Sequence, residues 1–184
     1  MILDCFENLL KNCLECRCCD LHRVRNNVVF GFGSKTAELM LIGEAPGKNE
    51  DITGKPFMGR SGKLLDRMLS QIGLSRDEIF IANIIKCRPP LNRNPSKAEI
   101  SQCIPFLLKQ IEIINPKIIV CLGRVSACQI ISKDFKVTSQ HGQWVLKNKR
   151  MYMGTFHPAA LLRNPHCIPL AEQDFFEIQK QLTI

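Results

Sequence analysis

Residues 38–85 read "ELMLIGEAPGKNEDITGKPFMGRSGKLLDRMLSQIGLSRDEIFIANII", and this stretch decides the fold. Its first part, 38–47, is an apolar strand that ends in a Gly/Pro turn. The part at 61–74 predicts a helix, because apolar residues recur on one helix face at Leu64, Leu65, Met68, Leu69 and Ile72. Its last part, 79–85, is a second strand of the fully buried type. A strand, a helix and a strand in this order predict a parallel pair joined by a crossover.

The rest of the chain continues the alternation of strands and helices. Further strands are predicted at 117–123, 142–147 and 150–158. A capping box formed by Ser96 and Glu99 predicts the start of another helix. Two more helices are predicted at about 125–131 and at 170–182. This alternation favours an α/β sandwich with a largely parallel sheet, in a single domain of residues 1–184.

Charge and targeting signals limit the class of protein. Lys and Arg total 25 against 17 Asp and Glu, a net charge of +8 that favours polyanionic partners. No apolar run reaches the roughly 20 residues that span a bilayer. The first residues include acidic side chains and no basic n-region, so they do not resemble a signal peptide. We therefore expect a cytoplasmic protein with no membrane partner.

The ten cysteines indicate a metal site, because a reducing compartment disfavours disulfides. Cys121 and Cys128 stand in an apolar setting, where small buried side chains are expected. The segment "NCLECRCCDL" offers two overlapping C-x-x-C pairs, and Cys87 and Cys103 follow with fifteen residues between them. One such pair with these two thiols would suit zinc or an iron–sulfur cluster. Spacing alone leaves both metals open.

Four segments, in order, carry a resemblance to a known family. They read "CRCCDLHRVRNNVVFGFG", "GEAPGKNEDITGKPFMGRSG", "NIIKCRPPLNRNPSKAEISQC" and "FHPAALLRNP". This series resembles the iron–sulfur uracil-DNA glycosylases, family 4 of the uracil-DNA glycosylase superfamily. The resemblance implies a three-layer αβα sandwich around a mostly parallel four-stranded sheet. It also implies a monofunctional enzyme, a monomer, that acts on uracil in single- or double-stranded DNA in a bacterial or archaeal cytosol.

The resemblance also implies the cofactor and its ligands. In the family about eight residues separate the second cysteine from the "VVFG" valines, and eight residues separate Cys19 from Val28 here. The implied ligands of a 4Fe-4S cluster are therefore Cys16, Cys19, Cys87 and Cys103. Such a cluster would cross-link the N-terminal arm to the loop at 87–103.

An enzyme that flips a base needs groups that read it, and the predicted strand ends supply them. Phe57 would stack on the uracil ring. Asn83 would donate to O4 and accept from N3–H, a pattern that cytosine reverses. His157 would donate to O2, where negative charge collects as the bond breaks.

The turn at 43–47 provides the other pocket residues. Glu44 is the candidate for the carboxylate that positions the attacking water beside C1′. Ala45 stands where many other glycosylases of the superfamily have an Asp. Unlike an Asp, an alanine side chain has no group that could act as a base. Gly43 permits close backbone approach. By resemblance, Glu50 would close the pocket near C5 and exclude the methyl group of thymine.

Basic residues in the loops predict a DNA-facing rim, formed by Arg88, Arg93, Lys97 and Arg163. Two other kinds of protein share some of these features. A relative that captures DNA covalently carries a histidine after "CRPP", and the segment "LNRNPSKAE" has none. A non-catalytic metal module that binds nucleic acid would explain the charge and the cysteines. It would leave the combination of Glu44, Phe57, Asn83 and His157 unexplained.

Overall fold

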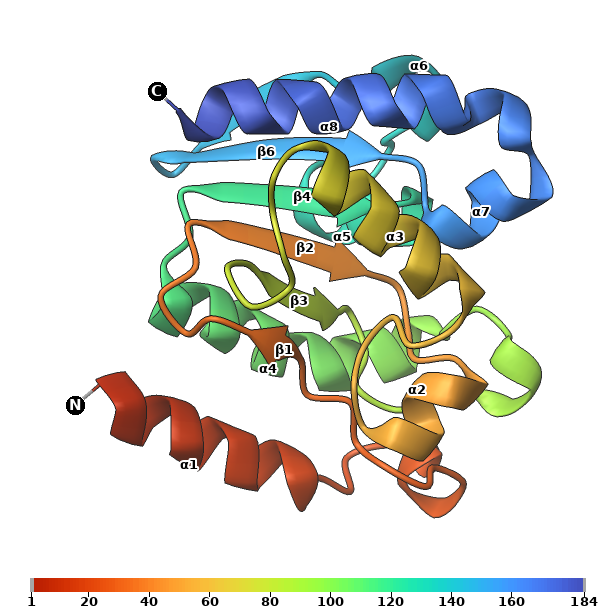
Figure 1. The fold of residues 1–184 in the computed structure, drawn as a ribbon. Helices are drawn as coiled ribbons and strands as arrows, with labels where there is room; N and C mark the ends of the chain where they lie inside the picture. Colours follow the sequence, from red (N-terminus) through yellow and green to blue (C-terminus); the bar gives the residue numbers. More distant parts are fainter. Residues whose placement is uncertain (1, 184) are drawn as a thin grey trace.

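The computed structural model describes residues 2–183 and has a six-stranded sheet at its centre (Figure 1). The strand order is β1-β3-β2-β4-β6-β5. The strands are β1 (Phe32–Gly33), β2 (Leu39–Gly43), β3 (Phe80–Asn83), β4 (Ile118–Leu122), β5 (Trp144–Lys147) and β6 (Arg150–Thr155). The four inner strands, β3, β2, β4 and β6, are parallel, as predicted.

Two antiparallel edge strands make the sheet wider than the predicted four strands. β1 has only two residues, too few for any periodic pattern in the sequence. β5 joins β6 through a tight turn in which Asn148 and Lys149 have positive φ, the geometry of a two-residue hairpin. The four-stranded sheet that the resemblance implied corresponds to the parallel part. The strand predicted at 142–147 is confirmed as the edge strand β5, and β1 was not predicted.

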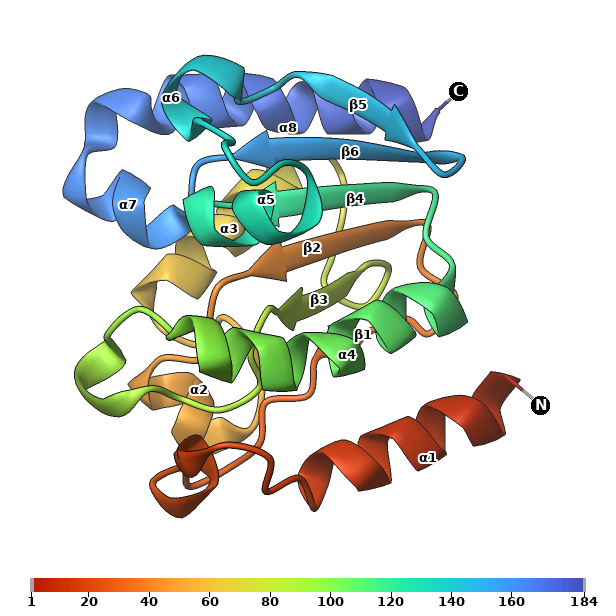
Figure 2. The same cartoon turned by 180° about the vertical axis from the view of Figure 1, so that it is seen from behind.

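Helices cover both faces of the sheet (Figures 1 and 2). The long helices are α1 (Ile2–Leu14), α3 (Arg60–Gln71), α4 (Lys97–Ile114) and α8 (Ile168–Leu182). The short ones are α2 (Lys48–Thr53), α5 (Arg124–Ile130), α6 (Val137–Gln140) and α7 (Pro158–Arg163), with 3₁₀ turns η1 (Asp20–Arg23), η2 (Pro90–Asn92) and η3 (Pro165–Cys167). Helices α3, α7 and α8 lie on one face, and α1, α4 and α5 on the other, which confirms the three-layer α/β sandwich.

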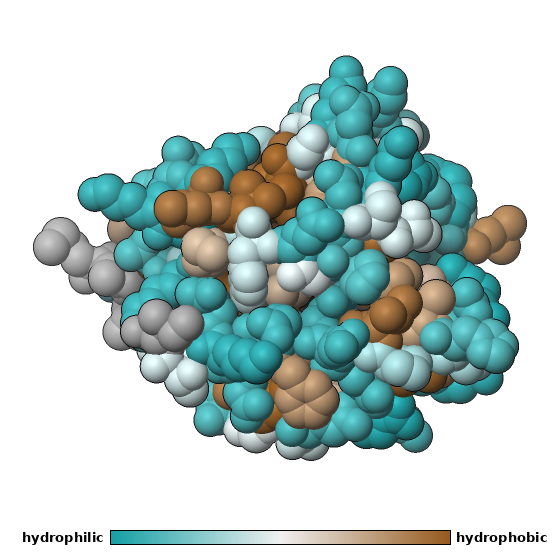
Figure 3. All heavy atoms as spheres, turned by 90° about the horizontal axis from the view of Figure 1, so that it is seen from above, coloured by the Kyte–Doolittle hydropathy of each residue, from teal (hydrophilic) through white to brown (hydrophobic). Residues whose placement is uncertain are grey.

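The core divides along the sheet because successive strand residues point to opposite faces. Leu39 and Leu41 of β2 pack in the cluster that includes α3 and α8. Met40 and Ile42 pack in the cluster that includes α1, α4 and α5. Seen from above, the side of the molecule at which α8 and β6 lie in Figure 1 is mostly hydrophilic, with hydrophobic side chains gathered in a few patches (Figure 3). None of the helices within residues 2–183 combines the length and apolar composition that crossing a membrane requires.

Candidate functional site

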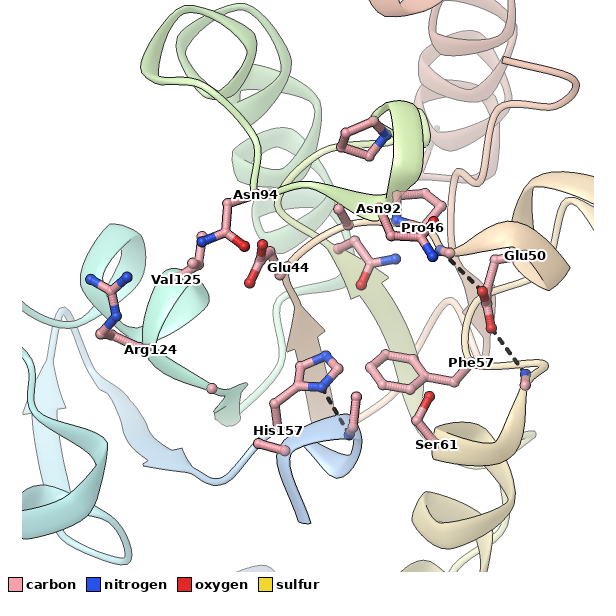
Figure 4. Close-up of a pocket in the computed structure, with 18 of the residues that line it drawn as sticks. Glu44, Pro46, Glu50, Phe57, Ser61, Asn92, Asn94, Arg124, Val125 and His157 are labelled. Atoms are coloured by element: carbon pink, nitrogen blue, oxygen red, sulfur yellow. Dashed lines mark hydrogen bonds between the residues drawn. The ribbon is translucent and has the colours of Figure 1, made fainter. Parts of the chain in front are cut away.

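A pocket of about 730 Å³ opens beyond the carboxyl ends of the parallel strands (Figure 4). The loops after β2, β3, β4 and β6 all contribute to its wall. Eight of the residues predicted from the sequence line it: Glu44, Ala45, Glu50, Phe57, Asn83, Arg93, His157 and Arg163. Residues from four separate segments thus meet in one cavity, as expected for strand ends in an open α/β sheet.

Asn83 forms the floor of the pocket, and the predicted Gly43 lies beside it without lining the cavity. They are opposite one another in the parallel pair of β2 and β3. Asn83 is only 2% exposed, and its Oδ1 has no hydrogen-bond partner within the described residues. A Cβ on Gly43 would lie 2.4 Å from that oxygen and 2.8 Å from the Phe57 ring. Glycine is therefore required here by space, and it leaves the buried amide facing the cavity.

Phe57 is held at the side of the pocket by a strained backbone. Its φ is 54°, in the left-handed region that residues with a side chain rarely adopt. Arg76 braces this conformation by donating to the carbonyl of Pro56 at 2.8 Å and to that of Phe57. A Cβ on Gly62 would lie 1.7 Å from the same Phe57 carbonyl, so α3 packs directly against it. No pattern in the sequence indicates this bracing role of Arg76.

His157 occupies the opposite side, with its ring centroid 5.7 Å from that of Phe57. It is the N-cap of α7, and its Nδ1 accepts from the backbone N–H of Ala159 at 3.1 Å. Burial, together with the charge of Arg163, lowers the pKa of His157 to about 4. The imidazole is therefore neutral near pH 7. Since Nδ1 is an acceptor, the proton resides on Nε2, which is free to donate.

Glu44 follows β2, lines the pocket and is partly buried. Burial raises the pKa of its carboxyl, and the nearby charge of Arg124 acts in the opposite direction. Figure 4 shows Glu44 near His157, with Arg124 further out on the same side of the cavity. Arg124 begins α5, directly after β4, and was not among the predicted site residues. Its place after a strand end was the signal available in the sequence.

Glu50 lies in the wall of the pocket, but its carboxylate accepts hydrogen bonds from backbone N–H groups. It is 8% exposed and accepts from the N–H groups of Gly47 at 3.0 Å, Met58 at 2.7 Å and Gly59 at 3.0 Å. These bonds tie the start of α2 to the start of α3 (Figure 4). Gly59 is the N-cap of α3, so the helix begins at Arg60, one residue before the predicted Ser61.

The predicted rim residues differ in how freely they can contact a ligand. Arg93 lines the pocket and forms two hydrogen bonds to Glu99, at 2.9 and 2.6 Å, which hold the pKa of that carboxyl down at about 2. Arg163 ends α7 and is exposed. Arg88 donates to Asn92 at 2.7 Å, and Lys97 is exposed at the start of α4. Neither Arg88 nor Lys97 lines the pocket.

The cysteine-rich segment lies beside the loop after β3. Among residues 2–183, no group of three or more metal-binding side chains is arranged closely enough to hold an ion. The four predicted ligands are nevertheless neighbours. The charges of Cys16 and Cys19 help to raise the pKa of the Cys87 thiol, and those of Cys87 and Cys16 help to raise that of Cys103. Burial is the main cause in both cases, and the pKa of Cys103 reaches about 11.

Polar groups around these thiols fit a bound anionic cluster. The guanidinium of Arg25 donates to Cys87 Sγ at 3.1 Å, and the backbone N–H of Lys86 donates to Cys103 Sγ at 3.2 Å. N–H donors and cations at the sulfur atoms are what a thiolate cluster uses to balance its charge. Cys13, which the resemblance left without a role, is buried beside them. Cys18 is exposed.

The comparisons with known proteins agree with this arrangement. The model of the uracil DNA glycosylase superfamily matches residues 30–182. A type-4 uracil-DNA glycosylase from Sulfurisphaera tokodaii is 46% identical over 97% of this chain and 85% of its own length. Those from Saccharolobus solfataricus and Archaeoglobus fulgidus are 45% and 39% identical, over 92% and 96% of this chain and 82% and 92% of their own lengths. The chain therefore belongs to the uracil DNA glycosylase superfamily and, within it, to the type-4 uracil-DNA glycosylases.

Proposed function

We propose that this chain hydrolyses the N-glycosidic bond of deoxyuridine in DNA, with the base flipped into the pocket, and leaves an abasic site. Removal of uracil from DNA is the activity of the type-4 glycosylases to which the chain belongs. One observation carries the assignment of the pocket. The Oδ1 of Asn83 is a buried acceptor without a partner within residues 2–183, and Asn83 lines a cavity with an aromatic ring at its side. A buried orphan acceptor of this kind is unfavourable unless a ligand supplies a donor.

Asn83 and Phe57 would recognise the base. Uracil offers the N3–H donor and the O4 acceptor side by side, which match the Oδ1 and Nδ2 of an asparagine amide. Cytosine offers the reverse pattern at these positions, so it would leave both amide groups facing like groups. Phe57 would stack on the ring, and its braced backbone fixes the plane in which the base enters.

His157 would stabilise the departing base. As the bond between C1′ and N1 breaks, its electron pair passes to uracil and negative charge gathers on O2. A neutral imidazole that donates from Nε2 favours this charge in the transition state more than in the substrate. The hydrogen bond from Ala159 to Nδ1 supports this role, because it selects the tautomer with the proton on Nε2.

Glu44 would act on the sugar side. Its carboxylate would orient the water that attacks C1′ and accept a proton from it, while offsetting the positive charge that builds up on the sugar. The charge of Arg124 supports this role, since it favours the ionised form that the water needs. Ala45 has no group that could share the task.

The structure favours a different role for Glu50 from the one expected from the resemblance. A carboxylate that accepts three backbone N–H groups has little capacity left for a ligand. We assign Glu50 to positioning: it holds together the two loops that carry Glu44 and Phe57. Gly43, beneath the base, would provide the space in which Asn83 and Phe57 approach one another.

A 4Fe-4S cluster on Cys16, Cys19, Cys87 and Cys103 is the cofactor that we assign to the chain. Family membership and the donors from Arg25 and Lys86 to the sulfur atoms support it. When bound, the group would supply structural cross-linking between the arm before β1 and the loop after β3. Purified protein should then be brown and contain iron and sulfide, whereas colourless protein with zinc would refute the assignment.

The same proposal covers the partners and the form of the protein. Arg88, Arg93, Lys97 and Arg163 would follow the phosphates on either side of the flipped nucleotide. Residues 1–184 would act as one domain and as a monomer in the cytosol.

The direct test is incubation with an oligonucleotide that contains one uracil, followed by alkaline cleavage. We expect a strand break at the uracil and none at a cytosine in the same place. Glu44→Gln and His157→Ala should each lower the rate strongly while leaving visible absorbance unchanged. His157→Ala should also lower the unfolding temperature slightly, because it removes the acceptor of the Ala159 N–H. A pure, brown wild-type protein that produces no break would end the glycosylase proposal in favour of a binding module.

A further inference from the structure

Asp174, on α8, is a buried carboxylate that the mechanism proposed above does not use. It is 4% exposed. Taking a carboxylate out of water is costly unless hydrogen bonds or an opposite charge compensate for the loss. Here the hydroxyl of Thr155 donates to Asp174, and Nδ1 of His141 lies 3.0 Å from both carboxylate oxygens. Burial raises the pKa of Asp174, and these two hydrogen bonds act in the opposite direction. The carboxylate is therefore the centre of a specific polar cluster.

The first partner of Asp174 lies in the segment that leads to His157. Thr155 is the last residue of β6 and stands two residues before His157. Its hydroxyl donates to Asp174, and its carbonyl accepts from the N–H of Gly123 at 2.8 Å. A Cβ on Gly123 would lie 2.8 Å from the Cβ of His157, so the loop after β4 also touches the histidine. The end of β6 is thus held both by α8 and by the loop after β4.

The second partner holds Phe156, the residue directly before His157. The rings of His141 and Phe156 are in contact, with centroids 4.7 Å apart, and Phe156 lines the pocket. Because an ionised carboxyl only accepts, the proton of the pair lies on Nδ1 of His141, and this hydrogen bond orients the ring on which Phe156 packs. A Cβ on Gly142, where φ is 70°, would lie 2.4 Å from Asp174 Oδ1, so glycine is required for this close approach.

The place of the His157 imidazole matters because a misplacement of about 1 Å at a reacting centre can cost about 100-fold in rate. We propose that Asp174 is a positioning residue for the glycosylase reaction. Through Thr155 and His141 it fixes the end of β6, and with it the imidazole that donates to the departing base. This inference rests on the proposed function and goes beyond it, because Asp174 itself does not line the pocket.

The test asks whether Asp174 acts through His157 or only on stability. Asp174→Ala should lower kcat on a uracil-containing oligonucleotide by about tenfold or more, while KM changes by less than about twofold. Asp174→Asn keeps an acceptor for the Thr155 hydroxyl, so it should retain most of the rate. In a chain that already carries His157→Ala, the change Asp174→Ala should lower kcat by less than about twofold, because the group that it positions is absent.

Two more variants separate positioning from a loss of stability. Thr155→Val removes one hydroxyl at nearly constant shape, so it should reproduce the fall in kcat even if Asp174→Ala is too unstable to assay. Gln179→Ala is the matched control on the same helix. The amide of Gln179 donates to the carbonyl of Ile72 at 2.9 Å, so its removal should lower the unfolding temperature slightly and leave kcat unchanged.

Nitrogen NMR of the His157 ring provides a measurement that needs no substrate. The wild-type ring should show the tautomer with its proton on Nε2, and in Thr155→Val the signals should move toward a mixture of both tautomers as the hydrogen bond from Ala159 loosens.

Four results would each overturn the positioning role. They are an equal fractional loss of kcat with and without the His157 imidazole, a loss confined to KM, an unchanged kcat in both Asp174→Ala and Thr155→Val, and an unchanged tautomer in Thr155→Val. Wild-type protein that is inactive on uracil would instead refute the proposed function, and the NMR comparison would then decide the positioning role by itself.

Discussion

Replacement of Glu50 provides a quantitative test of the pocket wall. Glu50→Ala leaves the N–H groups of Gly47, Met58 and Gly59 without their acceptor. A buried donor without a partner costs about 1–3 kcal/mol. Gly47 and Gly59 line the pocket, where water can reach them, so we take the low end for each donor. The expected loss is about 3 kcal/mol of the free energy of unfolding, or about 6–12 °C for a chain of this length.

Glu50→Gln should be milder, because one oxygen remains for Met58 and Gly59 while the amide nitrogen meets the N–H of Gly47. We expect a loss of about 1–2 kcal/mol. Glu38→Ala is the matched control, since this exposed carboxylate forms an ion pair with Lys117 at the surface. The loss of free energy of unfolding in this variant should stay within about 0.5 kcal/mol. Urea unfolding followed by circular dichroism measures all three variants.

The outcome also decides between the two roles considered for Glu50. If it braces the loops, Glu50→Ala should lower both stability and the rate on uracil, and thymine should remain excluded. A loss of less than about 1 kcal/mol would refute the brace. Excision of thymine by a stable Glu50→Ala protein would restore the role near C5 that the resemblance implied.

Three more outcomes are expected. The pKa of His157, about 4, lies below the ordinary value of 6.5, so the unfolded chain takes up a proton before the folded protein does as the pH falls. The free energy of unfolding should therefore fall between about pH 6.5 and 4, by up to about 3 kcal/mol. Urea unfolding at several pH values measures this, and His157→Asn should lack this part of the pH dependence. Cys103→Ala should lose visible absorbance and solubility, while Cys18→Ala, at an exposed position, should lose neither. A Cys103→Ala protein that is soluble, well folded and free of the cluster would contradict the proposed set of ligands. Lys86→Met removes the donor to Gln110 Oε1 and to the Asn83 carbonyl, so it should lower the free energy of unfolding by about 2 kcal/mol. Urea unfolding measures this loss. An unchanged value would show that these hydrogen bonds do not stabilise the protein.

The parallel part of the fold could be predicted because its signal is local. β2, β3 and β4 are short apolar runs bounded by turns, and every residue of each is buried. β1 could not be predicted, because two residues define no period. The small helices α2, α6 and α7 were missed for a similar reason, since four to six residues are too few to set a face.

The residues of the site likewise include some that could be predicted from the sequence and some that could not. Glu44 directly follows β2, Asn83 ends β3 and His157 comes two residues after β6, so their meeting in one pocket could be foreseen from the topology. The bracing by Arg76 and Glu50 could not, because both act on backbone groups, which every residue has. No sequence pattern distinguishes an arginine that reaches two carbonyls from one that faces solvent.

The position of the thiols favours a structural use of the proposed cluster over a redox use. Hydrolysis of the N-glycosidic bond moves no electrons between the enzyme and the substrate, so catalysis itself needs no redox partner. The two segments that carry the thiols are instead connected to the pocket by hydrogen bonds, one to its floor and one to its wall. Lys86, next to Cys87, donates from Nζ to the carbonyl of Asn83 at 3.0 Å.

The second connection runs through α2. Asp51 is buried and accepts from the backbone N–H of Asn26 at 2.9 Å, while its neighbour Glu50 holds the loops of Glu44 and Phe57. Removal of the metal should therefore loosen both the floor and the wall. Because alignment of the base suffers before the chemistry does, we expect KM for uracil-containing DNA to rise by a larger factor than kcat falls. Protein stripped of iron with an unchanged KM and a reduced kcat would instead mean that the cluster acts on the chemical step.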